Sequence, residues 1–455
     1  MNKLSLRDKL GYGGAAYSDS VSYSLVGTFL LFFLTTVAGI QPAIAGVILA
    51  IGTIADACFN PVMGYISDNI RTKWGRRVPF LVVFGTGLFV TLTLLFTSVH
   101  GPSWFKSMYY GLFTVLFWLS FTGFYIPFTA LGAEITQDYN ERTKLRSFAS
   151  FTNLVGSLIA MSLPTLMVDF MERLGMTEGT AWMITAGLIG LTAMLGVIAT
   201  ALIGRKYDLP AGPDDPPAAK LNLAVMIREY IEVLKLGPIK YLVLTSFMFL
   251  IGYEFMLSDL LYYLTYNWSM DSVGISATLM FRCIMGIALV PIFSWAAQRT
   301  DKKTTLIASQ IIAAVALCVC QIIGVGTYAW LGVLIIFVAV IACGYWQLMP
   351  AMVYDLCEYD QLENGVIRQG TIVSAHGLVE SISSGIGAAL LGLVLQFAGF
   401  NGEAATQTAI AENWIAYCLT YIPALFLVLS CLMLWKYPIT RAVYDEICRK
   451  LAERK

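Results

Sequence analysis

The sequence predicts an all-α integral membrane protein with twelve transmembrane helices. Of its 455 residues, 58% are hydrophobic and only 13% are charged, whereas a soluble domain averages roughly 45–50% apolar and about 25% charged residues. The mean hydropathy is +0.72, and the apolar residues form continuous runs rather than the alternating pattern of a membrane barrel. This composition argues against a soluble enzyme.

Twelve apolar stretches reach the length of about 20 residues that a helix needs to cross a bilayer. The start of the chain lacks the features of a cleavable signal peptide, so the first stretch is expected to remain as a span. In order, the predicted spans are 12–39, 42–67, 78–99, 104–132, 147–171, 180–204, 239–267, 272–298, 304–325, 329–356, 369–398 and 412–436.

The longest polar interruption, 205–238, divides the spans into six and six. Its Pro, Gly and Asp residues at 209–217 are typical of a linker. We expect an N-terminal six-helix bundle that carries the cation site over 1–204, a central cytoplasmic loop over 205–238, and a C-terminal six-helix bundle with a cytoplasmic tail over 239–455. Two such halves are what a major facilitator fold requires.

Basic residues predict the orientation of the chain in the membrane. Of the 29 Lys and Arg residues, only Lys106 and Arg173 lie in the loops of one side, and Arg282 lies inside a span. Loops rich in Lys and Arg face the cytoplasm. Both termini are therefore expected to be cytoplasmic, in a multi-pass protein of a bacterial-type inner membrane.

An acid beside basic residues follows the second span, and a fainter copy follows the eighth span at 297–303. Such a turn can lock two helix ends together at the cytoplasmic face and act as a gate. A plain positively charged cytoplasmic loop would have a similar composition. The predicted gating residues are Asp68, Arg71, Arg76 and Arg77.

Ionisable residues inside the spans are the best functional candidates, because a charge at mid-bilayer costs at least ~2.5 kcal/mol. They are Asp19 and Asp56 in the first two spans, Glu254 and Asp259 in the seventh, Arg282 in the eighth, Asp355 and Glu358 near the end of the tenth, and His376 and Glu380 in the eleventh.

Asp56 and Asn60 are four residues apart, so they share one helix face. Their oxygens could hold Na⁺, or the carboxylate could carry a proton. The alternative is a carboxylate that only bonds neighbouring helix ends. Asp19 could accept hydrogen bonds from a hydroxyl-rich substrate, or it could serve helix packing.

The acids of the C-terminal half leave two interpretations open. Glu254, Asp259 and Glu380 could face one cavity with Arg282, or all four could form a charge-balanced structural network. His376 and Glu380, again four residues apart, could form a proton relay or a packed local pair. Asp355 and Glu358 lie next to the cytoplasmic loop, where a solvated or gating role is expected rather than substrate contact. The intramembrane acids to which no definite site is assigned are Glu254, Asp259, Asp355 and Glu358.

Arg282 needs an offset for its charge, and Glu254 and Asp259 on the preceding span are the nearest candidates by helix order. Arg282 either pairs with one of them permanently or anchors a polar or anionic group of the substrate.

Other chemistry finds no support in the sequence. No Walker motif or hydrolase constellation stands out, so the chain is not expected to be an enzyme or to need a cofactor. The nine cysteines have no metal-ligand spacing and are expected to be buried thiols, with no metal site. The Gly-rich pieces at 11–14 and 385–387 lack the lysine of a phosphate loop and indicate close helix packing instead. The balanced charge gives no sign of nucleic acid binding.

Several motifs together resemble the glycoside–pentoside–hexuronide:cation symporters, the melibiose-permease branch of the major facilitator superfamily. They are Lys9-Leu-Gly-Tyr-Gly-Gly14 with Asp19, Asp56-Ala-Cys-Phe-Asn-Pro-Val-Met-Gly-Tyr-Ile-Ser-Asp68, Arg71-Thr-Lys-Trp-Gly-Arg-Arg-Val-Pro79, Tyr125-Ile-Pro-Phe-Thr-Ala-Leu131, Glu141-Arg-Thr-Lys-Leu145 and Tyr354-Asp-Leu-Cys-Glu-Tyr359. The resemblance covers essentially the whole chain, and the second-span motif with its trailing loop is its most specific part.

The resemblance implies that Asp56 binds the coupling cation and that Asp19 contacts the sugar. The chain departs from the family pattern at Asn60, where the best-studied members carry a second acid. It departs again in the sugar site, where Tyr125 replaces the fourth-span acid and Thr129 replaces an aromatic residue. The arginine of the fifth span and the lysine of the eleventh are replaced by Ala149 and Glu380, and Trp346 stands near the tenth-span aromatic. These departures put an ordinary family sugar in doubt.

We therefore expect a monomeric cation-coupled symporter that imports a glycoside or related hydroxyl-rich small molecule by alternating access in a lipid bilayer. The coupling ion is H⁺ or Na⁺; a lone desolvated carboxylate tends to take up a proton, which slightly favours H⁺. The alternatives are an amphipathic or lipid-like substrate and a membrane sensor that does not transport.

Overall fold

The computed structural model describes residues 4–69, 72, 74–135, 139–208, 228, 231–233, 237–365, 369–402, 404 and 406–453. The regular elements over these ranges are all helical. Twelve helices of the described chain are long and apolar enough to cross a membrane. The predicted all-α fold with twelve spans is therefore confirmed.

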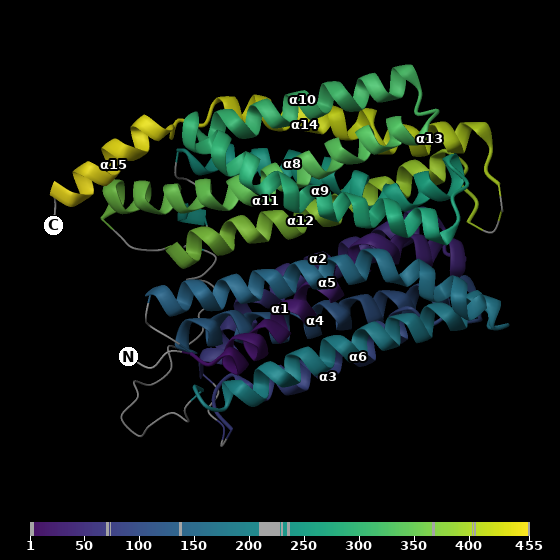
Figure 1. The fold of residues 1–455 in the computed structure, drawn as a ribbon, viewed down its shortest axis with the longest axis horizontal. Coiled ribbons are helices and arrows are strands. Elements are labelled where there is room, and N and C mark those ends of the chain that lie inside the picture. The colour runs from purple at the N-terminus through teal and green to yellow at the C-terminus, as the bar shows by residue number, and fades with distance from the viewer. Residues whose placement is uncertain are drawn as a thin grey trace. The chain divides into compact units, whose positions relative to one another are not determined.

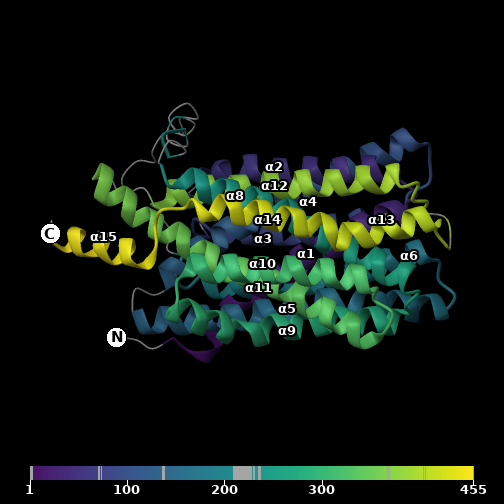
Figure 2. The same ribbon diagram turned by 90° about the horizontal axis from the view of Figure 1, so that it is seen from above.

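The chain forms two compact units. The first consists of Met1–Leu221 with Ser269–Ala277 and Phe400–Gln407, and the second consists of Asn222–Trp268, Thr278–Gly399 and Thr408–Lys455. Figures 1 and 2 agree that the long helices within each unit lie alongside one another as a bundle.

The first unit is built from helices that follow one another through short loops. They are α1 (Leu6–Phe32), continued by the π-helical turn η1 (Phe33–Val37), α2 (Pro42–Asn69), α3 (Val78–Leu95), α4 (Ser103–Ile135), α5 (Tyr139–Arg173) and α6 (Glu178–Gly204).

The second unit repeats this plan and adds a tail helix. Its elements are α8 (Ile239–Tyr262), the π-helical turn η2 (Tyr263–Asn267), α9 (Ser272–Arg299), α10 (Lys302–Ile323), α11 (Tyr328–Asn364), α12 (Gln369–Phe397), α13 (Ala409–Leu419), α14 (Tyr421–Trp435) and α15 (Arg441–Glu453). The first residues of α9, up to Ala277, belong to the first unit. The twelfth span consists of α13 and α14 together. Helix α15 extends from the end of this bundle (Figure 1) and packs on α11.

Several helices extend beyond their predicted ends; α5, for example, begins at Tyr139 rather than at 147. Helix α1 begins at Leu6 rather than at 12, because Ser5 and Asp8 form a capping box that satisfies its first amides. Helix α11 runs to Asn364, past the predicted end at 356, and stops where Gly365 adopts a left-handed conformation. The polar residues of these turns are therefore helical although they lie outside the apolar stretches.

Helix α1 packs on both α5 and α6. Glycines at the contacts permit the close approach because they have no side chain. A Cβ on Gly14 would lie 2.5 Å from the carbonyl oxygen of Gly196, and a Cβ on Gly196 would lie as close to that of Gly14. In α5, a Cβ on Gly156 would lie 2.6 Å from the carbonyl oxygen of Tyr17. The glycines at 11–14 thus serve helix packing, as the sequence indicates.

Helix α8 has the corresponding role in the second unit, where it packs on α12 and α14. A Cβ on Gly387 would lie 2.7 Å from the Cβ of Glu254, and one on Gly252 would lie 2.8 Å from the Cβ of Phe426. Gly387, of the Gly-rich piece at 385–387, therefore also permits close packing.

An internal repeat relates the first helices of the two units. Helices α1 and α8 both end in a five-residue π-helical turn. Helices α2 and α9 both have 28 residues, and each carries an interior proline, Pro61 and Pro291, at the same distance from its first residue. A proline removes one helical hydrogen bond and bends the helix, so the second helix of each unit is interrupted at the same level.

Candidate cation and substrate sites

Asp56 belongs to α2, faces α4 and is a buried acid within a membrane-spanning helix of the first unit. Its side chain is 9% exposed. Asn60, one turn later on α2, donates its amide hydrogens to the Asp56 backbone oxygen at 3.0 Å and to Oδ2 at 3.2 Å. Thr122 of α4 donates its hydroxyl to Asp56 Oδ1. The helix face shared by Asp56 and Asn60 is therefore completed by a hydroxyl from another helix.

The packing of α2 on α4 explains why Thr122 reaches this position. One turn before Asp56, a Cβ on Gly52 would lie 2.5 Å from Thr114 and 2.6 Å from Trp118. Thr114, Trp118 and Thr122 follow one another at four-residue spacing, so they line the same face of α4. The close approach at Gly52 thus brings that face, and with it Thr122, against Asp56.

Asp19 of α1 is half-buried and is held by α5. Asn153 Nδ2 donates to Asp19 Oδ2 at 3.1 Å and to the carbonyl oxygen of Ala16 at 3.3 Å. Among the described residues, Asp19 Oδ1 has no hydrogen-bond partner. One carboxylate oxygen is therefore fixed by an amide while the other remains able to accept a hydrogen bond.

The remaining candidates of the first unit lie on α4. The ring of Tyr125 stacks on Phe121, with centroids 5.8 Å apart and planes 10° from parallel, and Phe128 lies beyond it at 6.5 Å. The Thr129 hydroxyl donates to the carbonyl oxygen of Ile126 at 2.9 Å. Tyr125 is three residues from Thr122, so a single helix carries the hydrogen-bond partner of Asp56 and an aromatic candidate for the substrate.

In the second unit, His376 and Glu380 belong to a larger polar cluster. His376 Nδ1 lies 3.6 Å from Glu380 Oε1, and His376 Nε2 is hydrogen-bonded to Ser246 Oγ of α8 at 2.8 Å. Tyr345 of α11 donates its hydroxyl to Glu380 Oε1 at 2.9 Å. Three helices thus meet around one carboxylate.

Arg282 does not pair with the acids that its helix order suggests. Its Nη2 donates to the hydroxyl of Tyr253 at 3.2 Å. Glu254 accepts from Ser258 at 3.1 Å and lies against Gly387 of α12, while neither oxygen of Asp259 has a hydrogen-bond partner among the described residues. Helix α8 is rotated so that Tyr253, rather than Glu254, reaches the guanidinium.

Trp346 is 43% exposed and lies beside two tyrosines. Its ring meets Tyr345 edge to face at 5.4 Å and Tyr253 at 6.5 Å. Because Tyr253 also receives the Arg282 hydrogen bond, the exposed tryptophan and the buried arginine are neighbours of the same tyrosine.

Asp355 and Glu358 lie in the C-terminal part of α11. Lys302 Nζ lies 2.7 Å from both Asp355 oxygens, which joins α10 to α11. Glu358 Oε2 lies 4.0 Å from the Cys448 sulfur of α15. These acids join helix ends, in keeping with their expected place near a loop.

The predicted gating turn is described only in part. Arg71 and the side chain of Asp68 lie outside the described residues. The backbone amides of Arg76 and Arg77 donate to Asp208 at 3.0 and 2.7 Å, and that of Val78 donates at 2.8 Å. Asp208, four residues after the end of α6, therefore caps the first turn of α3.

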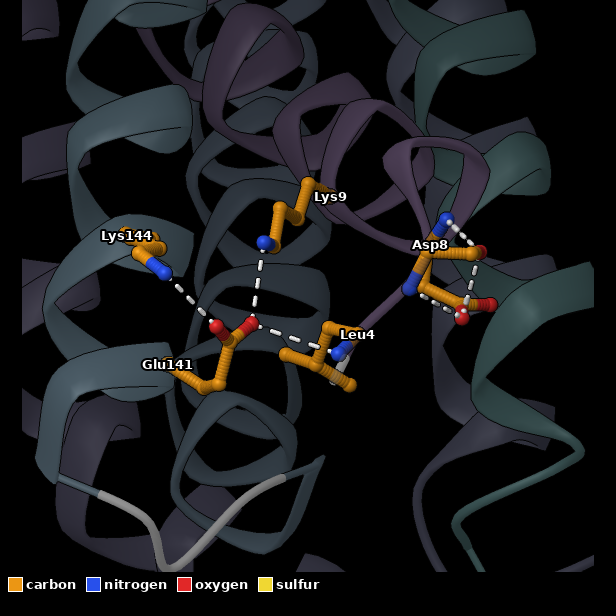
Figure 3. A network of polar contacts seen from close by, with 6 residues as sticks. Leu4, Asp8, Lys9, Glu141 and Lys144 are labelled. Atoms are coloured by element: carbon orange, nitrogen blue, oxygen red, sulfur yellow. Dashed lines mark hydrogen bonds and ion pairs between the residues drawn. The ribbon is translucent and has the colours of Figure 1, made fainter. Parts of the chain in front are cut away.

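Glu141 is the centre of an ion-pair network that the sequence does not single out as a site (Figure 3). Its Oε2 lies 2.9 Å from Lys9 Nζ, and its Oε1 lies 2.9 Å from Lys144 Nζ. The backbone amide of Leu4 also donates to Oε2, at 3.2 Å. The hydrogen bonds from Lys144 and Lys9 lower the pKa of Glu141 from 4.5 to about 2, so its negative charge ties the start of α1 to the start of α5.

Several partners of these sites are not recognisable from the sequence, among them Tyr253, which bonds to Arg282. Thr122, Asn153, Ser246 and Tyr345 are ordinary polar residues within apolar helices, and Asp208 and Glu141 lie in charged segments where acids are common. Only the hydrogen bonds across helices distinguish them.

Known proteins resemble this chain over nearly its whole length. The family described as MFS/sugar transport protein matches residues 10–441. An uncharacterized symporter of Synechocystis sp. is 26% identical, covering 100% of this chain and 98% of that protein. The isoprimeverose transporter of Lactiplantibacillus pentosus is 24% identical over 97% of this chain and 90% of its own. The sodium-dependent lysophosphatidylcholine symporter 1 of Xenopus tropicalis is 23% identical over 96% and 88%.

Solved structures support the fold alone. A bacterial homologue of the human drug peptide transporters PepT1 and PepT2 gives a TM-score of 0.69 at 13% identity, covering 97% of this chain and 99% of that chain. The nucleoside transporter NupG gives a TM-score of 0.68 at 14% identity, covering 95% and 100%. With twelve apolar helices and a match that spans residues 10–441, the chain is a multi-pass membrane protein that belongs to the MFS/sugar transport protein family, among relatives of the glycoside–pentoside–hexuronide:cation symporter type.

Proposed function

We propose that the chain is a cation-coupled symporter that imports a glycoside or a related hydroxyl-rich molecule by alternating access. The observation that carries the proposal is Asp56, an enclosed carboxylate inside the membrane that meets Asn60 on its own helix and Thr122 on α4. A charge in such a place costs free energy unless a partner offsets it. A coupling cation is the partner that a symporter supplies.

The site suits a single positive charge. One carboxylate neutralises either a proton or Na⁺, and hydroxyl and amide oxygens are ligands that a hard cation accepts. Asn60 now presents its nitrogen to Asp56, as expected beside an ionised carboxylate. For Na⁺ its amide would have to turn and offer its oxygen, whereas a proton needs no such turn.

Coupling follows from the shared helix α4. Thr122 contacts Asp56, and Tyr125 lies one turn further along the same helix. If cation binding fixes α4 in the position that favours substrate, substrate must favour cation binding by the same free energy. The proposed substrate ligands of the first unit are Asp19, Tyr125 and Thr129.

A hydroxyl-rich substrate suits these groups. Asp19 Oδ1 can accept a hydroxyl hydrogen while Asn153 fixes the other oxygen, and the aromatic ring of Tyr125 can cover an apolar face of a sugar. For the second unit the proposed substrate ligands are Arg282, Trp346, His376 and Glu380. Arg282 would replace the positive charge that the family pattern places in other helices. The turn with Asp68, Arg71, Arg76 and Arg77 remains the proposed gate.

The decisive experiment measures uptake into proteoliposomes driven by either a proton or a Na⁺ gradient. Isoprimeverose, a phenyl glucuronide and lysophosphatidylcholine are the test substrates, chosen from the names of relatives. Asp56→Asn should abolish uphill uptake and retain exchange down a gradient. The matched control is Asp169→Asn, because Asp169 only pairs with Arg173 one turn away on α5. Concentrative uptake by Asp56→Asn at the parent rate would remove Asp56 from coupling.

A lipid-like substrate is the second candidate. A relative of this chain is named a lysophosphatidylcholine symporter. Tyr125, which replaces the fourth-span acid of the family pattern, is surrounded by the rings of Phe121 and Phe128. Gradient-driven uptake of lysophosphatidylcholine with no uptake of either sugar would favour this candidate. Binding of any of the three compounds with no ion or substrate flux would instead identify a sensor.

A further inference from the structure

Four polar side chains of the second unit contact one another in a row within the membrane-spanning helices. Ser246 bonds to His376 Nε2 at 2.8 Å, His376 Nδ1 lies 3.6 Å from Glu380 Oε1, and Tyr345 donates to that same oxygen at 2.9 Å. We propose that this quartet of Ser246, Tyr345, His376 and Glu380 is a proton-binding site, separate from Asp56 and additional to the proposed coupling site.

The quartet is enclosed on most sides. The His376 side chain is 7% exposed and the Glu380 side chain is 23% exposed, while Tyr345 is fully buried. The ring of Phe249 stacks on Tyr345 with centroids 4.0 Å apart and planes 4° from parallel. Water therefore reaches the cluster from the side of Glu380, which is the route by which a proton can enter and leave.

Glu380 uses its two oxygens differently. Oε1 receives the Tyr345 hydrogen bond and faces His376, whereas Oε2 has no hydrogen-bond partner among the described residues. Oε2 can take a proton from the aqueous phase without breaking the contacts of Oε1. Protonation turns the carboxylate into a neutral carboxylic acid, and release returns the same proton to water.

His376 can share that proton. Its Nε2 is held by Ser246, which fixes the ring so that Nδ1 faces the carboxylate. With a neutral imidazole and an ionised Glu380 the quartet carries one negative charge, and one added proton on either group makes its net charge zero. An acid and a histidine at this separation titrate as a pair, so the proton belongs to the quartet rather than to one residue.

The neighbouring helices supply no basic side chain that pairs with Glu380 over the described residues. Over the described residues, the elements that pack most closely on α12 are α8, α11 and α13. Helix α11 contributes Tyr345, which bonds to Glu380. Helix α8 contributes Ser246, and its Glu254 lies farther along, against Gly387 of α12. Helix α13 carries Glu412 near its start, beyond the far end of α12. Over the described residues, no Lys or Arg forms a salt bridge with Glu380. Because an uncompensated charge is costly in the membrane, the structure favours uptake of one proton.

The test is a proton titration of the purified protein in detergent, without substrate. Glu380→Gln should bind one proton fewer than the parent between about pH 5 and pH 8, a window in which an ordinary glutamate is already ionised. Glu412→Gln is the matched control and should leave the proton count in this window unchanged. Infrared spectra of the same samples should show a protonated carboxyl band that disappears as the pH rises and is missing in Glu380→Gln.

Equal proton counts for the parent and Glu380→Gln would overturn the proposal. If Glu380→Gln does not fold, Tyr345→Phe decides, since it keeps the acid and the stacked ring but removes the hydroxyl that bonds to Oε1. The titrating carboxyl band must then shift its frequency and its midpoint, and an unchanged band would overturn the proposal. The measurement needs no substrate, so its outcome is independent of what the chain transports and of Asp56.

Discussion

At the scale of single residues, a side chain on a second helix completes each candidate site. Asp56 and Asn60 share a face of α2, but the hydroxyl that bonds to Asp56 belongs to Thr122 of α4. Asp19 likewise depends on Asn153 of α5. These partners fix the orientation of the carboxylates, so they should influence cation or substrate affinity although neither is charged.

Thr122 should therefore contribute to cation affinity. A hydrogen bond to a charged group contributes about 1.5–3 kcal/mol, and each 1.4 kcal/mol is about tenfold in affinity. Thr122→Val should change the apparent affinity for the coupling cation by about tenfold or more. Affinity for Na⁺ should weaken, because a hydroxyl ligand is lost, whereas affinity for H⁺ should increase, because the hydrogen bond stabilises the ionised Asp56. Thr122→Ser should stay close to the parent. The measurement is the cation-concentration dependence of uptake in proteoliposomes.

Thr53→Val is the control for Thr122→Val, because the Thr53 hydroxyl bonds only to carbonyl oxygens of its own helix. Thr53→Val is expected to retain the parent's cation affinity. Equal affinities for Thr122→Val and the parent would show that the Thr122 hydroxyl is no part of the cation site.

Glu141 should make stability depend on acid pH. The pKa of Glu141 is lowered from 4.5 to about 2 in the folded protein by its bonds to Lys144 and Lys9. A lowered folded-state pKa confers stability that is fully present above 4.5 and is lost as the pH falls toward 2. Glu141→Gln should thus unfold at a lower temperature than the parent near neutral pH, with the difference shrinking on acidification.

The measurement for Glu141 is thermal unfolding in detergent from about pH 6 to about pH 3. Glu446→Gln serves as the control, since Glu446 pairs with Lys450 on an exposed face of α15 and both side chains are half-exposed. Its unfolding temperature should stay near that of the parent. A deficit of Glu141→Gln that does not change with pH would contradict the assignment.

At the scale of elements, the start of α3 depends on a residue far away in the sequence. Arg77, the residue before α3, makes no side-chain cap. Asp208 instead accepts hydrogen bonds from the amides of Arg76, Arg77 and Val78. Gly75, at φ +104°, allows the approach, because a Cβ there would collide with the Asp208 carboxylate. The cap joins the end of α6 to the turn after α2.

Asp208→Ala should therefore loosen the first turn of α3. Loss of a helix cap costs about 0.5–2 kcal/mol, and the local effect should appear as faster amide hydrogen exchange at Arg76, Arg77 and Val78. Asp301→Ala is the matched control, because Asp301 precedes α10 at the corresponding place in the second unit and its side chain makes no capping bond. Unchanged exchange in α3 of Asp208→Ala would show that the cap contributes nothing.

At the scale of the whole molecule, the composition of the loops predicts the topology. On the predicted spans, the Lys and Arg residues concentrate in the loops of one side, which predicts that both termini are cytoplasmic. An even number of spans, twelve, requires the two termini to lie on the same side. The prediction concerns the chain's insertion and is independent of its substrate.

Reporter fusions test this topology. A fluorescent protein that matures only in the cytoplasm should be bright when fused after Lys455. Alkaline phosphatase, which is active only outside the cytoplasm, should be active when inserted after Gly101 in the loop between α3 and α4. Active phosphatase after Lys455 would reverse the predicted orientation.

The sequence by itself determined the spans and the helix faces that lie on one span. A membrane helix must be apolar over a known length, so the twelve stretches can be recognised without any tertiary contact. The same is true of Asp56 with Asn60 and of His376 with Glu380, because helical periodicity alone places residues four apart on one face. The polar helix ends, such as Ser5 to Asp8, the start of α5 and the last turns of α11, were not predicted, and neither was the division of the twelfth span into α13 and α14.

Tertiary structure decided which residues meet across helices. Arg282 bonds to Tyr253 rather than to the acids one or six positions further along α8, and Glu380 is joined to Tyr345 and Ser246. These pairings depend on how each helix is rotated about its axis and how closely it approaches its neighbour. Small residues such as Gly14 against Gly196 set that approach. Because hydropathy records only whether a segment prefers lipid to water, it contains no information on that rotation.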